Sequence, residues 1–295
     1  KGLKKIALAT AVAAAPFAAQ ADLKAMDDSA MGNVTGQAGV TIELETKVSI
    51  GQFKYTDEGS FAVNDIVLGG AGVTAEGAAA GYNDLLDQLK IDIDVADDGD
   101  AVIHVGTLDG NPIDWGMTVG SMELLAGGTG SDSTTLISNL SGYGNLAQLD
   151  IRVDTATDYL NIAAAFDVQD MDFDVDFLGI GVRDMVITGA GDNFDYDGDG
   201  DTLAEAGTEF GLDPTNPEDA KKLGVLKGFA NVNLNVYKGA GLGASTATDV
   251  LRIDVNNVYM DMTIGAVEIG GTSIGSFAID NLAVTDTKLA VYGKD

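Results

Sequence analysis

The sequence contains no cysteine and a single histidine, His104. These absences exclude disulfides and the usual zinc sites, which are built from cysteine and histidine. Catalysis of the Ser-His-Asp kind could centre only on His104, and no Gly-x-Ser-x-Gly motif accompanies it. His104 lies in the alternating run Val102–Val105, which is typical of a strand. A lone histidine in a strand is more often structural than catalytic.

Aromatic side chains are also few, with one tryptophan and 6% Phe, Trp and Tyr together. Glycosidases use paired carboxylates, and their clefts usually stack sugars on several aromatic rings, so this composition fits them poorly. The glycine-rich runs lack the lysine and the strand-loop-helix context of a phosphate-binding motif. We therefore expect a protein that is not an enzyme, without catalytic or organic-cofactor-binding residues.

Basic residues are scarce: 16 Lys and Arg stand against 46 Asp and Glu, a formal net charge of −30. Such a charge opposes binding to nucleic acid and to anionic lipid. It suits high ionic strength, where self-repulsion is screened within about 8–10 Å.

Long apolar runs are missing too, because no stretch approaches the roughly 20 apolar residues that a transmembrane helix needs. We expect no nucleic-acid partner and no integral membrane span.

Proline is rare, with four residues, whereas glycine contributes 39 and apolar residues 45% of the chain. This composition argues against disorder and predicts many short strands joined by tight turns. The expected fold is all-β: a multi-stranded, mainly antiparallel sheet protein, either an elongated β-sandwich or an irregular β-solenoid.

Residues 1–21 are typical of a secretory signal peptide. Three lysines come first, an apolar run follows at 6–15, and Ala19-Gln20-Ala21 forms a cleavage site. The leader carries three of the 16 basic residues and none of the acidic ones, so the remainder has 13 against 46, a charge of −33. We expect export to the cell surface or medium, with the periplasm or an association with the outer membrane as alternatives.

Residues 22–44 form a separate N-terminal segment. Helix-like spacing of Leu23, Met26, Met31 and Val34 predicts a short helix, and alternation predicts a strand at 40–44. The run from Met26-Asp27-Asp28 to Gly36-Gln37-Ala38-Gly39-Val40 resembles the N-terminal signature of an exported Gram-negative family of unknown function that includes Fil-type pilus-system proteins. The resemblance implies export and a surface or filament-related role, and it brings no catalytic residues.

An eight-residue pattern recurs in the β-rich domain expected at 45–295. Two alternating apolar residues are followed by two small or polar residues and two more alternating apolar ones. A flat strand would turn the second half outward, so we expect a bulge or bend at the central pair that keeps all four apolar side chains on one buried side. The copies lie at 61–68, 117–124, 180–187, 262–269 and 277–284.

Two longer stretches, 89–140 and 251–282, each contain a strand, an octet and an Ile-x-Asn-Leu strand, which predicts a duplicated module. The carboxylates that alternate along 167–176 are typical of a solvated strand face. Residues 190–222 are acidic and then contain proline, and they predict a surface insertion with a short helix.

The acidic insertion holds the sharpest candidate site. Alternating carboxylates with intervening glycine are suited to Ca²⁺, which takes six to eight oxygen ligands. A true EF-hand is excluded because its closing acidic position falls on Ala206. We expect a looser calcium loop, with a solvated acidic loop as the alternative; its ligands would be Asp195, Asp197, Asp199, Asp201 and Glu205.

Together these features predict an exported structural protein, a subunit of or accessory to a cell-surface filament, pilus-like assembly or matrix, stabilised by calcium. Its partners would be further copies or other assembly subunits, joined through β-strand edges. The alternative is a periplasmic or outer-membrane-associated β protein that holds a lipid or other apolar ligand along the octets.

Overall fold

The computed structural model describes residues 39–57, 59–96, 98–127, 133–191, 215–216 and 226–292. The chain divides into two compact units, Lys1–Ala38 and Gly39–Asp295. The expected signal peptide and N-terminal helix, and the expected helix of the 190–222 insertion, therefore lie outside the described residues. The account below concerns the unit Gly39–Asp295.

Thirteen strands and three short helical segments make up the described part of this unit. In chain order they are β1 (Val40–Thr46), β2 (Val48–Thr56), β3 (Ser60–Gly69), η1 (Ala71–Val73), α3 (Ala75–Ala80), β4 (Leu86–Val95), β5 (Ala101–Thr107), β6 (Ile113–Leu125), β7 (Ser133–Asp154), β8 (Tyr159–Phe166), β9 (Asp170–Val175), η2 (Asp176–Leu178), β10 (Ile180–Thr188), β11 (Ala230–Gly239), β12 (Val250–Ile269) and β13 (Thr272–Val291).

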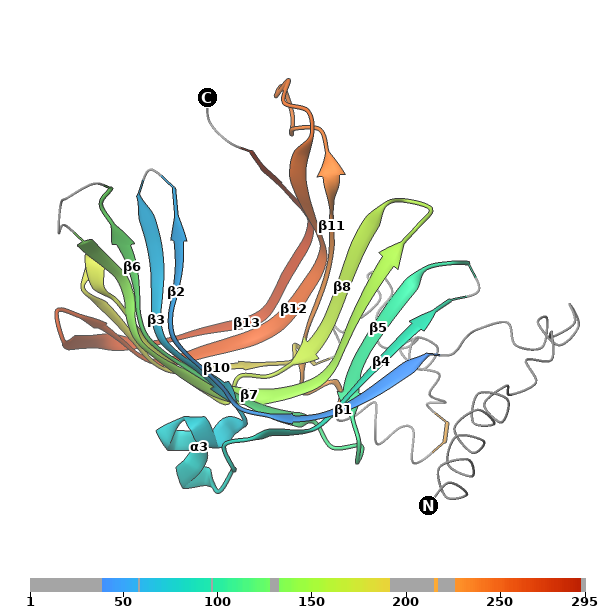
Figure 1. The fold of residues 1–295 in the computed structure, drawn as a ribbon. Coiled ribbons are helices and arrows are strands. Elements are labelled where there is room, and N and C mark those ends of the chain that lie inside the picture. The colour runs from blue at the N-terminus through green and yellow to red at the C-terminus, as the bar shows by residue number, and fades with distance from the viewer. Residues whose placement is uncertain are drawn as a thin grey trace, which may run out of the picture. The chain divides into compact units, whose positions relative to one another are not determined.

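All thirteen strands belong to one branched antiparallel sheet (Figure 1). One series of neighbours, half-sheet A, runs β2–β3–β6–β7–β9–β10–β12–β13. The other, half-sheet B, runs β1–β4–β5–β7–β8–β11–β12–β13. The long strands β7, β12 and β13 pass through both, which is why the two halves form a single sheet.

Strands of half-sheet B largely alternate apolar and polar residues, and the register places apolar residues opposite apolar ones. In β8, Ala163 and Ala165 take positions that are polar in other strands. Directly paired residues lie on the same face of a sheet. One row of such pairs runs across seven strands through Val40, Ile93, Ile103, Ile151, Ile162, Leu234 and Val255. The neighbouring row on the other face runs through Thr41, Asp92, His104, Asp150, Ala163 and Asn233. The sheet therefore has one apolar and one polar face.

The recurring octets pair with one another. Residues 61–68 of β3 lie opposite 117–124 of β6, and residues 180–187 of β10 lie opposite 262–269 of β12. Asp65 and Asp184, the second residues of their central pairs, have left-handed φ angles of 53° and 52°. Each lies next to the central glycine of the partner octet, Gly120 or Gly265, between directly paired residues on either side. These left-handed residues mark the bends that the sequence predicts.

The bend brings both halves of an octet to one face, as Met262, Ile264 and Val267 line the same hollow. The expectation that these side chains are buried is wrong for several of them. Leu124 is 48% exposed and Ile269 53% exposed. The physical reason is that, within the described residues, no second layer packs on the apolar face, so side chains near strand ends stay in contact with solvent.

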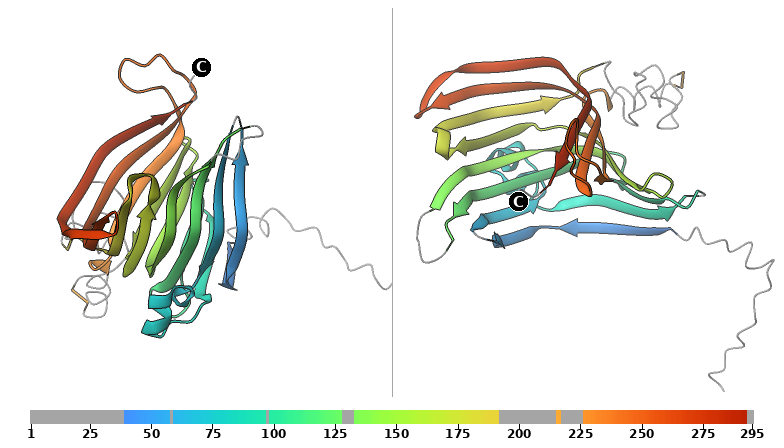
Figure 2. Two further views of the ribbon diagram at one scale, coloured as in Figure 1. Left: turned by 90° about the vertical axis from the view of Figure 1, so that its left-hand side faces the viewer. Right: turned by 90° about the horizontal axis from the view of Figure 1, so that it is seen from above.

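The polar face carries the short segment η1–α3. The Ala71 N–H donates a hydrogen bond to Asp114 Oδ2 at 2.7 Å, and the Thr74 side chain caps α3 by accepting from the Gly77 N–H. Gly116 leaves room for this approach, since a Cβ there would lie 2.5 Å from the Gly70 carbonyl oxygen. The sheet curves away from the side that carries α3 (Figures 1 and 2), so the apolar face lines the inner side of the curve.

The all-β, antiparallel class is confirmed. Of the two architectures expected, neither a pair of separate sheets nor parallel solenoid coils is seen among the described strands, which instead form the one branched sheet. In the first expected module the strand at Leu89 lies in β4, apart from the octet strand β6. In the second, Leu251 and the octet share β12. A common origin of the two modules therefore stays a prediction.

No helix within the described residues is both long enough and apolar enough to cross a membrane.

Candidate functional site

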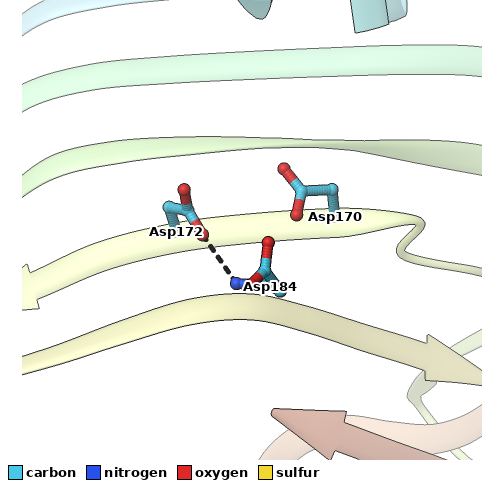
Figure 3. A group of neighbouring side chains, drawn as sticks. All are labelled: Asp170, Asp172 and Asp184. Carbon is cyan, nitrogen blue, oxygen red and sulfur yellow. Dashed lines mark hydrogen bonds between the residues drawn. The ribbon is translucent and has the colours of Figure 1, made fainter. Parts of the chain in front are cut away.

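The residues predicted to bind calcium, Asp195, Asp197, Asp199, Asp201 and Glu205, lie outside the described residues. The structure does bring together another set of carboxylates, on the polar face of half-sheet A. Asp170 and Asp172 come from β9 and Asp184 from the bend of β10 (Figure 3). Their nearest oxygens lie within 4.8 Å of one another.

The backbone holds two of these aspartates in place. Because Asp184 adopts the left-handed conformation, its N–H points along the sheet and donates to Asp172 Oδ1 at 2.8 Å. Burial raises the pKa of Asp170 to about 6, and the negative charges of Asp172, Glu76 and Asp184 act in the same direction. Asp170 therefore takes up a proton at a higher pH than an ordinary aspartate does.

Three carboxylates can supply part of the coordination of a hard cation, which needs six to eight oxygens in the case of Ca²⁺. The sequence marks Asp170 and Asp172 through their alternation along 167–176. It gives no sign of Asp184, because that residue enters through the pairing of β9 with β10. The expectation that the carboxylates along 167–176 form a solvated face is wrong for Asp167, Asp170, Asp172 and Asp174, which are only partly exposed, whereas Asp176 is exposed.

His104 also forms a close polar contact on the described sheet. Its Nδ1 lies 2.6 Å from Asp150 Oδ1 on the adjacent strand β7, and Gln148 Nε2 donates to the other oxygen of Asp150 at 2.7 Å. The hydrogen bond with Asp150 raises the pKa of His104 above its ordinary value, against the opposing effect of partial burial. The contact ties β5 to β7, and no hydrogen bond joins His104 to a serine or threonine among the described residues.

The most distinctive surface is the set of free strand edges. Among the described strands, β1 pairs only with β4, β2 only with β3 and β13 only with β12. All nine residues of β2 are exposed, including Phe53 at 55% and Tyr55 at 61%. Most of β13 is exposed as well, including Phe277 at 51%. Edge strands with exposed apolar side chains are ready templates for pairing with a further strand.

The apolar face also has a local hollow beside β13. It measures about 260 Å³, and its lining is almost wholly apolar: Met262, Ile264, Val267, Phe277, Ala278 and Ile279. Half of these residues come from the β12 octet and the others from β13. The hollow is open to solvent and lies in half-sheet A, at the end formed by β12 and β13.

Fold and surfaces thus define an all-β protein built on a single antiparallel sheet with free edges. A model of a family of unknown function, DUF6160, matches residues 1–97, about a third of the chain. The matched stretch includes the N-terminal signature and reaches β4. No curated protein and no solved structure matches the chain.

Proposed function

We propose that this chain is an exported structural protein that serves as a subunit of, or accessory to, a cell-surface filament, pilus-like assembly or matrix. The observation that carries the proposal is the pair of edges that present exposed apolar side chains and that no other described strand covers. Soluble sheet proteins usually defend an edge with inward-pointing charge, proline or a covering loop. Here β2 presents Val48, Ile50, Phe53 and Tyr55 on an exposed strand.

Two further features support this function. The described core is small in volume, since its largest fully buried side chains are two aliphatic residues and three asparagines. A chain without disulfides and with so much exposed apolar surface gains stability by burying that surface against neighbours. The signature at 26–40, which resembles Fil-type pilus-system proteins, agrees with an exported surface subunit.

Sedimentation and negative-stain microscopy of the purified protein test the proposal. We expect oligomers whose mass grows with protein concentration. Phe53→Lys replaces an exposed apolar side chain of the edge strand β2 by a charge, and it should shift the protein to monomers. Lys54→Arg on the same strand is the matched control and should leave assembly unchanged. A protein that stays monomeric under all conditions, with discrete particles in the micrographs, contradicts the proposal.

Calcium stabilisation is part of the same proposal and rests on the aspartate-rich sequence from Asp195 to Glu205. Extracellular calcium modules bind at about 10⁻⁴–10⁻³ M. Isothermal titration should therefore give heat in the millimolar range, and replacement of Asp197 and Asp199 by asparagine should abolish it. Asp158→Asn, in a turn between β7 and β8, is the control. Absence of both heat and a thermal shift at millimolar calcium contradicts a calcium loop.

A second candidate function is the binding of a lipid or other apolar ligand. The observation that favours it is the apolar hollow between the β12 octet and β13. Native mass spectrometry of protein purified from its host tests this function. A co-purified lipid that is lost in Ile264→Asn, with monomeric protein in both cases, would favour ligand binding over assembly.

A further inference from the structure

The free edges lie at opposite ends of the same sheet. We call residues 40–56 the leading edge; they comprise β1, Lys47 and β2, and they begin both half-sheets. The trailing edge is β13, with 20 residues, and it ends both half-sheets. Each edge therefore runs the full width of the sheet, and the two have similar lengths.

The two edges also run in opposite directions. The leading edge passes from half-sheet B, through β1, to half-sheet A, through β2. The trailing edge starts in half-sheet A, where Phe277 pairs with Ile264, and ends in half-sheet B, where Val291 pairs with Leu251. A second copy placed in the same orientation beside the first would thus meet it with antiparallel strands, the arrangement of every described pair in the sheet.

One register places apolar residues of both edges on the same face. It aligns two pairs in half-sheet B and, after a one-residue bulge, four pairs that continue into half-sheet A. These pairs are Val40–Val291, Ile42–Leu289, Val48–Val284, Ile50–Leu282, Phe53–Ile279 and Tyr55–Phe277. Most of these side chains are exposed in the single chain: Val40 is 55% and Val291 51% exposed. Pairing would remove part of their apolar surface from water.

Two local features favour the same register. It places Gly51 opposite Asn281, whose φ is 55°, as Gly120 lies next to Asp65 and Gly265 next to Asp184. In the single chain a Cβ on Gly51 would meet no atom within 4 Å. The space beside Gly51 is therefore open to the bend of a neighbouring copy's strand. On the polar face the register sets Glu43 against Lys288, which are opposite charges at paired positions.

We propose that the leading edge of one copy pairs with the trailing edge of the next, antiparallel and in this register, so that the sheet continues from copy to copy. The inference rests on the proposed function, because it names the contact by which the subunits would join. Such a contact is head-to-tail: it uses different surfaces on the two copies and leaves one free edge at each end of the row.

Disulfide trapping tests the register, since the chain has no cysteine of its own. Thr41→Cys is mixed with Ala290→Cys, and in a second mixture Lys54→Cys is combined with Ala278→Cys. Both pairs are directly opposed in the proposed register, within the reach of a disulfide. We expect cross-linked dimers in both mixtures, several-fold above the mismatched control of Thr41→Cys with Ala278→Cys.

Three outcomes overturn the inference. Cross-linking of Thr41→Cys with itself would mean that leading edges meet each other. An internal disulfide in the monomeric double variant of Thr41→Cys and Ala290→Cys would mean that one chain closes its edges on itself. Equal cross-linking in matched and mismatched mixtures would mean that no register is preferred.

Sedimentation of the unmodified protein separates this inference from the proposed function. Oligomers that fail to give the matched cross-links would overturn the edge-to-edge contact and leave the structural function standing. Protein that stays monomeric and gives no intermolecular cross-link would overturn both.

Discussion

Asp170 shows how a single side chain makes the sheet sensitive to pH. Its pKa is raised from 3.8 to about 6 because the carboxyl is partly buried beside other negative charges. The folded state therefore holds this proton more tightly than the unfolded state, and stability falls as pH rises between these two values. Above that window the charged carboxylate remains a cost to the fold.

Replacing Asp170 by asparagine should remove this cost. We expect Asp170→Asn to raise the melting temperature at neutral pH and to give little gain near pH 3.5, where the wild-type carboxyl is already protonated. Thermal unfolding across this range measures the effect, with the exposed turn residue Asp158→Asn as control. A gain that does not change with pH would argue against titration of Asp170 as its cause.

His104 stabilises the fold through its charged form, and its contribution also falls as pH rises, but in a range above about pH 6.5. Its pKa is raised by the hydrogen bond with Asp150, so the contribution of the pair is fully present below about pH 6.5, the unperturbed value, and is lost as pH rises through the raised value. His104→Gln should therefore destabilise the protein at about pH 6 and have less effect at about pH 9. Equal losses at both values would mean that packing, and not charge, is what His104 contributes.

At the scale of the element, the bends of the paired octets depend on glycine. A Cβ on Gly120 would lie 3.1 Å from the Cβ of Asp65, and one on Gly265 would lie 2.8 Å from that of Asp184. Gly120→Val and Gly265→Val should therefore destabilise the fold by about 1–3 kcal/mol each, the usual cost of overpacking.

Gly51→Val is the matched control for these two variants, because a Cβ at this edge position meets open space. Denaturant unfolding of dilute, unassociated protein should show a loss at Gly120 and Gly265 and little change at Gly51. If all three variants unfold like the wild type, the bends do not require glycine.

Alternation along individual strands carries the part of the fold that could be predicted. It indicates β1 from Val40 onward. The phase shift between the two halves of each octet indicates the bends, and in the structure Asp65 and Asp184 have left-handed φ angles at these bends. These features depend on residues close together in sequence. The all-β class follows from the same local signals together with the many glycines.

Pairing between distant strands could not be predicted in this way. Nothing near Asp184 in sequence indicates that it meets Asp170 and Asp172, because the contact depends on the register of β9 and β10. The exposure of the octets has a similar cause: alternation shows which face is apolar, but not whether another layer covers it. The predicted calcium ligands lie outside the described residues and stay a prediction.

At the scale of the whole molecule, β7, β12 and β13 join the two half-sheets. Since each of these strands has partners in both, neither half can unfold without exposing the backbone of the other. We expect one cooperative transition. The single tryptophan, Trp115, reports on β6 of half-sheet A, and the stacked pair Tyr159 and Tyr237 reports on half-sheet B. Tryptophan fluorescence and near-ultraviolet circular dichroism of the tyrosine pair should give coincident unfolding curves. Different unfolding midpoints for the two signals would mean that the half-sheets unfold independently.

The placement of the two free edges has a kinetic consequence. If copies join only leading edge to trailing edge, every junction in a row is the same, and no copy contacts any but its immediate neighbours. The first addition then gains as much free energy as every later one, so growth needs no nucleus. Light scattering after dilution into assembly conditions should rise without a lag and should not respond to added seeds, whereas a seed-dependent lag would require contacts beyond a single sheet edge.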